Sequence, residues 1–164
     1  MSDFFLNTVL TFDASVRVCV PLIFASMAGL FAERSGVVDI GLEGKLLMSA
    51  FIAASAASVF GSPWLGLIAG MFASAVLAMI HGFASITYKG NQIVSGVAIN
   101  ILASGLTMIL TLAWFKRGGI TPTLQGDERF LSITLPGVDI IDHIPILGVI
   151  YRELISGHNI LVYL

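Results

Sequence analysis

The sequence predicts an all-α fold, a polytopic membrane bundle of about four spanning helices followed by the start of a fifth. Its 164 residues are 57% hydrophobic and only 11% charged, whereas a soluble domain carries about 25% charged residues. So short a chain has no interior large enough for that much apolar surface. Residues 46–88 and 90–115 contain no Asp, Glu, Lys or Arg, and one spanning helix needs about 20 apolar residues. The first stretch therefore holds two helices and the second holds one.

A membrane β-barrel is the alternative architecture for so apolar a chain. Barrel strands alternate apolar and polar residues over about ten positions. The runs here are uniformly apolar and rich in Ala, Leu and Gly. Helices are therefore favoured over strands.

We expect the four spanning helices at residues 15–32, 44–60, 63–88 and 92–115. Short turns separate the last three of them, "GSP" at 61–63 and "KGN" at 89–91. Pro63 suits the first position of a helix, where an N–H group has no partner within the helix. Trp64 and Tyr88 stand at the two ends of the third helix, as expected for side chains at the membrane interface.

Residues 116–157 differ in character from the preceding runs. Polar and charged residues, Gly and Pro become frequent, and no apolar run is long enough to span a bilayer. We expect a water-facing loop with short interfacial helices. A new apolar run, "HNILVYL", follows at 158–164, but a helix that short, rising about 1.5 Å per residue, does not cross a membrane. We therefore expect the chain to be the front part of a larger membrane protein.

Charge, cysteine and histidine content exclude several functions. The net charge is −2 and no basic face is present, so nucleic acid is not an expected partner. The single cysteine, Cys19, rules out an internal disulfide and an all-cysteine metal site. Its apolar surroundings predict a buried, inert thiol. His81, His143 and His158 lack the spacing of about three to five residues that is typical of metal-ligand pairs, so we expect no metal and no cofactor.

The third predicted helix carries a small residue at every fourth position. These residues are Gly66, Gly70, Ser74, Ala78 and Gly82. In lipid, helices associate through close backbone approach and interhelical hydrogen bonds rather than through the hydrophobic effect. We therefore expect a neighbouring helix to pack against this stripe.

The fourth predicted helix has a face of small and polar side chains, formed by Gly96, Asn100, Ser104 and Thr107. An amide such as Asn100 near the middle of a spanning helix is unfavourable unless it has a hydrogen-bond partner. Two interpretations remain open. The face either holds the bundle together through interhelical hydrogen bonds, which is the commoner use, or lines a polar path.

Residues 32–45, "AERSGVVDIGLEGK", place charged groups and glycines between two apolar runs. Irregular backbone at membrane depth occurs only where protein covers it or water reaches it. The segment is therefore either a plain solvated loop or a partly inserted re-entrant turn that leads into the second helix. Asp39 and Glu43 would face the same way if the segment were helical. Glu43 is either a functional side chain or one that caps the helix break.

Two motifs resemble those of a known family. The segments "GLFAERSGVVDIGLEGKLLMSAFIAA" (29–54) and "YKGNQIVSGVAINILASGLT" (88–107) resemble permease subunits of ATP-binding-cassette (ABC) importers for nucleosides and simple sugars, within the group that includes ribose-type and branched-chain amino-acid permeases. A third and weaker resemblance to the same family is found in "HIPILG" at 143–148, followed by "GHNILVYL" at 157–164. Together the motifs cover most of residues 15–164.

The resemblance implies that residues 1–164 are the N-terminal portion of a single permease transmembrane domain, in a multi-pass protein of the inner cell membrane. The implied partners, besides the lipid bilayer, are cytoplasmic ATPase subunits, a second permease subunit and an extracytoplasmic substrate-binding protein. The family's ATPase-coupling segment lies downstream of Leu164. The chain is not expected to be an enzyme itself, and its sequence has no GxxxxGK[ST] phosphate loop.

The implied activity is recognition and gating of a small polar solute, and both nucleosides and sugars remain open as substrates. Our candidates for the substrate pathway are Glu43, Asn91, Gln92 and Asn100. For Asn91 and Gln92 the alternative is turn chemistry and helix capping. A truncated or non-transporting membrane scaffold is the alternative function. A membrane-embedded enzyme is least favoured, because no acid–base set converges on one helix face beyond Asp39 and Glu43.

The resemblance also implies an orientation. It places residues 33–44 and 89–91 in the cytoplasm and the loop 116–157 outside. Cytoplasmic loops usually carry an excess of Lys and Arg, but here basic residues occur on both sides, for example Lys89 and Arg117. The charge pattern therefore does not determine the orientation, and the expected orientation rests on the resemblance.

Overall fold

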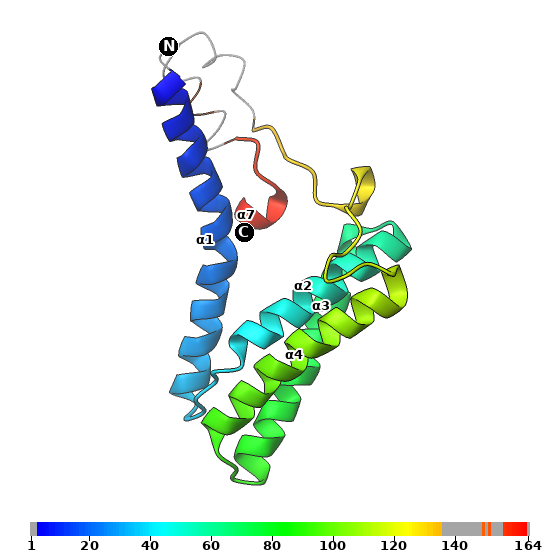
Figure 1. Ribbon diagram of the computed structural model, residues 1–164. Helices are drawn as coiled ribbons and strands as arrows, with labels where there is room; N and C mark the ends of the chain where they lie inside the picture. The colour runs from blue at the N-terminus through cyan, green and yellow to red at the C-terminus, as the bar shows by residue number, and fades with distance from the viewer. Residues whose placement is uncertain (1–2, 136–148, 150, 152–155, 164) are drawn as a thin grey trace. The chain divides into compact units, whose positions relative to one another are not determined.

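A computed structural model describes residues 3–135, 149, 151 and 156–163 of the chain. Four of its helices are long and apolar enough to cross a membrane. They are α1 (Asp3–Arg34), α2 (Leu42–Phe60), α3 (Pro63–Gly82) and α4 (Gln92–Phe115). The predicted all-helical membrane fold is confirmed for this part of the chain (Figure 1).

The first helix is longer than the predicted range 15–32, because α1 already begins at Asp3. Its first turns contain several polar residues, whose side chains bond within the helix. Arg17 pairs with Asp13 one turn earlier at 3.0 Å, a spacing that stabilises helices. Three hydroxyl groups donate to carbonyl oxygens four residues back, those of Thr8, Thr11 and Ser15. Polar residues before position 15 thus extend the helix rather than end it.

The prediction of a buried Cys19 is wrong, since this thiol is exposed. The most apolar stretch of α1 has no residue that is buried within the chain. The apolar residues around Cys19 in the sequence therefore did not mean that its thiol is buried within the chain. A helix that faces lipid or another subunit keeps apolar side chains on its outer surface.

Helices α2, α3 and α4 begin and end close to the predicted positions. Gly61 ends α2 in the left-handed conformation, with φ 63°, and Pro63 is the first residue of α3. After Gly82 the third helix continues as a π-helical turn, η1 (Phe83–Thr87). Asn91 caps α4, which spans the predicted range.

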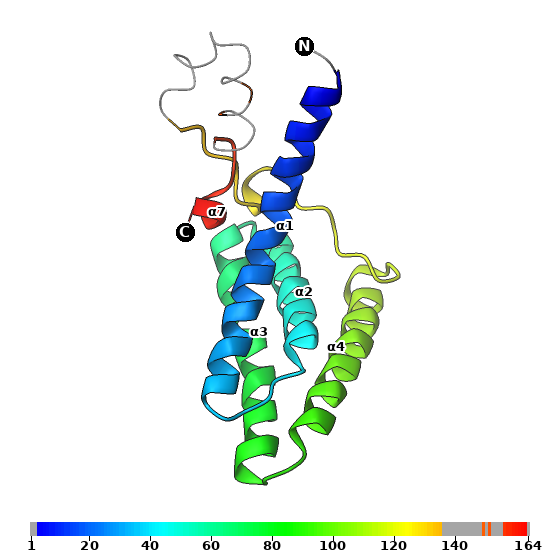
Figure 2. The same ribbon diagram turned by 90° about the vertical axis from the view of Figure 1, so that its left-hand side faces the viewer.

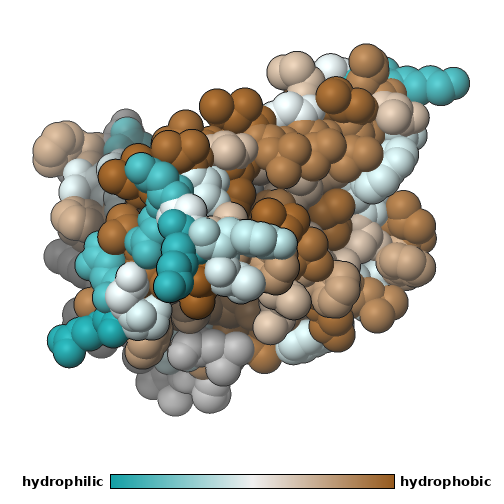
Figure 3. All heavy atoms as spheres, turned by 90° about the horizontal axis from the view of Figure 1, so that it is seen from below, coloured by the Kyte–Doolittle hydropathy of each residue, from teal (hydrophilic) through white to brown (hydrophobic). Residues whose placement is uncertain are grey.

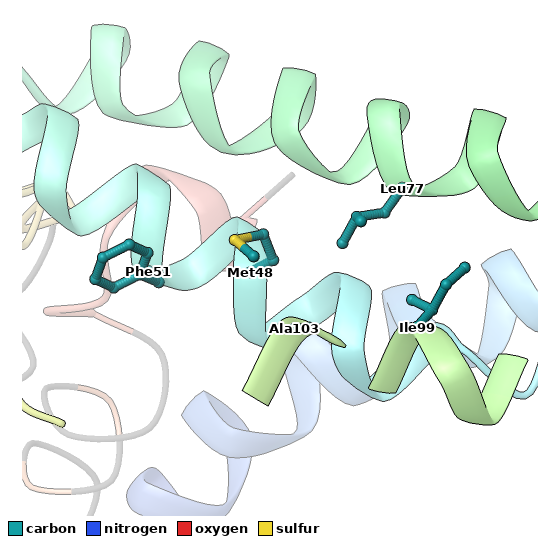
Figure 4. Packing of buried hydrophobic residues seen from close by; sticks show 5 residues of the cluster. All are labelled: Met48, Phe51, Leu77, Ile99 and Ala103. Atoms are coloured by element: carbon teal, nitrogen blue, oxygen red, sulfur yellow. The ribbon is translucent and has the colours of Figure 1, made fainter. Parts of the chain in front are cut away.

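The chain divides into two compact units, residues 25–129 and residues 1–24 with 130–164. In the first unit α3 packs against α2, and α2 packs against α4 (Figure 2). Five buried residues form its apolar core, Met48 and Phe51 from α2, Leu77 from α3, and Ile99 and Ala103 from α4 (Figure 4). The connection after α4 contains a short 3-10 helix, η2 (Gly126–Glu128).

Many large apolar side chains point outward from the spanning helices instead of joining this core. Much of the face shown in Figure 3 is apolar, and hydrophilic residues gather in smaller groups. Such a surface is unusual for a soluble monomer. It is the surface expected of helices that lipid or further membrane helices surround.

In the second unit, residues near positions 133 and 158 pair through their backbones. Ile133 N–H donates to His158 O at 2.8 Å, and the four-residue helix α7 (Ile160–Tyr163) follows. The predicted start of a fifth helix is therefore present in part. The motif at 143–148 and His143 lie outside the described residues, as does much of the predicted loop 116–157.

Candidate functional site

The segment between α1 and α2 turns back on itself before it enters α2. Its first part is tied to the end of α1, because Val37 N–H donates to Ala32 O at 3.0 Å. Gly36 has φ 83°, a backbone conformation that favours glycine. Residues 35–41 are non-helical, and we refer to them as the entry turn.

The entry turn lies along α4, to which two amide side chains join it. Val38 N–H donates to Gln92 Oε1 at 2.7 Å. Asn100 Nδ2 donates to Ile40 O at 3.1 Å. Since Gln92 and Asn100 are two helical turns apart, about 12 Å along the axis, the contacts run along the side of α4 rather than beyond its end. The irregular backbone is thus covered by protein on this side.

Asn100 also caps α2 from another helix. Gly44 N–H, one of the first amides of α2, donates to Asn100 Oδ1 at 2.7 Å. The N-cap residue Gly41 has no side chain with which to cap these amides, which lack partners within the helix. The Asn100 amide therefore satisfies one backbone donor and one backbone acceptor at the place where the turn becomes a helix.

Glycines allow the close approach between the entry turn and α4. A Cβ atom on Gly96 would lie 2.9 Å from Gly41 N, and one on Gly44 would lie 2.8 Å from the Asn100 Cα. Real Cβ atoms do not approach backbone atoms that closely. Close packing thus explains one glycine on each side of this contact, Gly44 in α2 and Gly96 in α4.

The four predicted pathway residues do not converge on one point. Gln92 and Asn100 bond to the entry turn. The Asn91 side chain accepts from Ile93 N–H and Val94 N–H and caps its own helix. Glu43 is exposed in the first turn of α2. It does not share a face with Asp39, because Asp39 lies outside the helix.

Part of the predicted small-residue stripe contacts α2. A Cβ atom on Gly66 would lie 2.7 Å from Ala53 O, and one on Gly70 would lie 2.8 Å from Ser49 O. Further along, Ser74 and Ala78 line a shallow groove that Gly70 and α2 also border. A Cβ atom on Gly82 would meet nothing within 4 Å. The close contact between α2 and α3 is therefore formed by the first half of the stripe.

Sequence reasoning missed a buried polar cluster formed by Asp39, Lys45, His81 and Ser95. The Lys45 ammonium group pairs directly with Asp39 Oδ2. Asp39 Oδ1 accepts from Gly41 N–H at 3.1 Å and lies 3.9 Å from His81 Nε2. On the other side of the imidazole, His81 Nδ1 lies 3.1 Å from Ser95 Oγ. The only sequence signal was the presence of Lys45 and His81 within runs of spanning length.

A groove of about 330 Å³ borders the distal half of the polar α4 face. Ser104, Thr107 and Thr111 line it from α4, opposite Ala50 and Phe51 of α2. The hydroxyl groups of Ser104 and Thr107 donate to carbonyl oxygens of their own helix. The polar face of α4 is thus covered by the entry turn in its first half and lines a groove in its second half.

No metal centre is formed by the described residues, in which no group of three or more His, Cys, Asp or Glu side chains is placed to hold an ion. Within the buried cluster the Asp39 carboxylate is already paired with a lysine. The arrangement is suited to holding backbone and helices in place rather than to coordinating a cation.

Comparisons with known proteins agree with the resemblance seen in the sequence. Residues 11–136 match the family described as "Branched-chain amino acid transport system / permease component". The chain is 39% identical over 144 residues to the guanosine ABC transporter permease protein NupQ of Bacillus subtilis, a match that covers 84% of this chain and 43% of NupQ.

Two further relatives are more distant. The nucleoside ABC transporter permease protein NupC of Lactococcus lactis is 33% identical over 137 residues, covering 80% of this chain and 41% of NupC. The putative glucose ABC transporter permease protein TsgC13 of Haloferax volcanii is also 33% identical over 137 residues, covering 83% and 39%. The chain thus spans about two fifths of the length of these curated relatives. No solved structure matches it significantly.

Proposed function

Because this chain belongs to the family of permease components of branched-chain amino acid transport systems, we propose that it forms part of the membrane pathway of an ATP-driven importer for nucleosides or simple sugars. One structural observation carries the proposal. The non-helical entry turn is held against the side of α4, between two helices of spanning length. Non-helical backbone at such a place is typical of segments that line a path or cavity within a membrane protein.

We propose a nucleoside as the substrate class. Two relatives are named as permeases for guanosine and for nucleosides, and a third as a putative glucose permease. The higher identity to the guanosine permease supports the nucleoside. Glucose remains the comparison substrate in any test.

In this proposal the chain performs recognition and gating, and its partners supply the energy and deliver the substrate. The partners are cytoplasmic ATPase subunits, a second permease subunit and an extracytoplasmic substrate-binding protein, assembled at the inner membrane. Gln92 and Asn100 shape the pathway by holding the entry turn. Glu43, which is exposed at the start of α2, is the pathway candidate whose side chain is best placed to meet solute.

The test is reconstitution of the chain with the proposed ATPase, second permease and binding protein. We expect the chain to co-purify with the ATPase in detergent. In liposomes, guanosine with its binding protein should stimulate ATP hydrolysis more than glucose does. A scaffold would co-purify without any substrate-stimulated hydrolysis. Absence of both association and stimulation would contradict the importer role.

A further inference from the structure

The buried polar cluster joins four separate elements of the unit formed by residues 25–129. Asp39 comes from the entry turn, Lys45 from α2, His81 from α3 and Ser95 from α4. The side chains of Asp39, Lys45 and His81 are only 10%, 6% and 3% exposed. The chain itself covers all three, so their burial does not depend on a missing partner.

Stability alone is a weak explanation for this cluster. Removing a lysine and an aspartate from water costs several kcal/mol for each ion, and well-packed apolar residues of similar volume often serve stability equally well. Ionisable side chains within spanning helices are rare, and they commonly mark functional positions. Lys45 and His81 both lie within helices of spanning length.

The geometry centres on the Asp39 carboxylate, which only accepts hydrogen bonds when it is ionised. His81 Nε2 makes no hydrogen bond among the described residues and faces this carboxylate at 3.9 Å. A proton on Nε2 is therefore the favoured tautomer, because a bare nitrogen would point its lone pair at an anion. Ser95 Oγ–H then donates to Nδ1. The imidazole links the entry turn to α3 and α4.

We propose that Asp39 is a positioning residue for transport, held between Lys45 and His81 so that the entry turn and the start of α2 keep one place relative to α3. The proposal rests on the transport function proposed above. The bonds from Gln92 and Asn100 attach the turn to α4 alone. The cluster supplies the connection to α3, and without it we expect the turn to stay folded but to lose its fixed position.

The first experiment separates positioning from stability with three variants in the assembled transporter. Asp39→Asn and Lys45→Met each leave one buried charge unpaired, so the amount of protein in the membrane should fall. The double variant has no unpaired charge, and its amount should recover. We expect its uptake of tritiated guanosine to stay reduced about tenfold. Wild-type uptake by the double variant would show that the pair is merely structural and would overturn the proposal.

The second experiment tests the donor on the imidazole. His81→Gln places an amide N–H near the position of Nε2, whereas His81→Leu fills the space without a donor. We expect uptake per molecule to be largely retained by His81→Gln and lost by His81→Leu. Glu33→Gln is the matched control, because it removes an exposed carboxylate from the last turn of α1, just before the entry turn, and it should transport normally. Equal uptake by the two His81 variants would contradict the proposal.

The proposed function is tested separately, by measuring uptake with the wild-type protein alone. Wild-type membranes that take up neither guanosine nor glucose in the presence of ATP and the binding protein would refute the importer. Wild-type uptake together with unimpaired double and His81→Leu variants would refute only the positioning role.

Discussion

Asn100 uses both ends of its amide, and each end satisfies a backbone group of another element. We predict that Asn100→Ala lowers stability by about 1–3 kcal/mol, because Gly44 N–H and Ile40 O lose their partner. Thermal unfolding of the purified transporter in detergent measures the effect. Ser104→Ala, one turn further along α4, is the control. The Ser104 hydroxyl bonds only to its own helix, and a change of about 0.5 kcal/mol or less is expected.

Gly44 is the second residue on which the contact between α2 and α4 depends. A methyl group there would lie 2.8 Å from the Asn100 Cα and 2.9 Å from Ile99 O, and backbone atoms yield less readily than side-chain ends. We predict that Gly44→Ala reduces the unfolding temperature and the amount of protein in the membrane. Gly105→Ala, at a position with open space within α4, should lower neither quantity, and the unfolding temperature should rise slightly because alanine favours the helix. If Gly44→Ala leaves the unfolding temperature and the amount of protein unchanged, α2 and α4 can move apart to accommodate the methyl group, and the prediction is wrong.

At the scale of elements, the packing of α3 on α2 depends on two glycines rather than on the whole predicted stripe. Gly66→Ala and Gly70→Ala should each weaken this contact, by about 1–3 kcal/mol, because the added methyl groups overpack the interface. Gly82→Ala is expected to increase the stability instead of lowering it. Its methyl group meets nothing, and alanine favours the helix by about 0.5–1 kcal/mol. Opposite shifts of the unfolding temperature would establish where the helices touch.

The sequence predicted the helices of residues 25–129 well, because their ends coincide with local signals. Pro63 starts α3, Gly61 ends α2 and Asn91 caps α4. The start of α1 was placed too late, since its polar first turns pair within the helix and leave no break in the pattern.

The candidate site was less predictable than the helices. Asn100 was recognised as a side chain in need of a partner, but the partner, an irregular turn about sixty residues earlier, was not visible in any periodicity. The segment that contains Asp39 and Lys45 was left open between a solvated loop and a partly inserted turn, and neither interpretation predicted that the two side chains pair. The other two members of the cluster, His81 and Ser95, come close to them only through the tertiary packing. Polar contacts between distant segments follow from the arrangement of the helices and not from local sequence.

At the scale of the whole molecule, each of the four described spanning helices exposes large apolar side chains, as expected of helices in lipid. The chain spans about two fifths of the length of its curated relatives. The exposed apolar side of α1 is the surface expected of a helix that meets lipid or other membrane helices. Neither the composition nor the packing of the helices determines which side of the membrane each helix end faces.

The orientation implied by the family resemblance gives a last prediction. Helix α4, of 24 residues, is about 36 Å long and crosses a hydrocarbon core of about 30 Å, so the residues before and after it face opposite sides. In a Cys19→Ser background, a membrane-impermeant thiol reagent should label Arg117→Cys in intact spheroplasts. Lys89→Cys, at the other end, should react only after permeabilisation. Both positions are exposed, so access depends on the membrane. The reverse labelling pattern would invert the topology and place the entry turn on the outer side, where the binding protein rather than the ATPase would approach it.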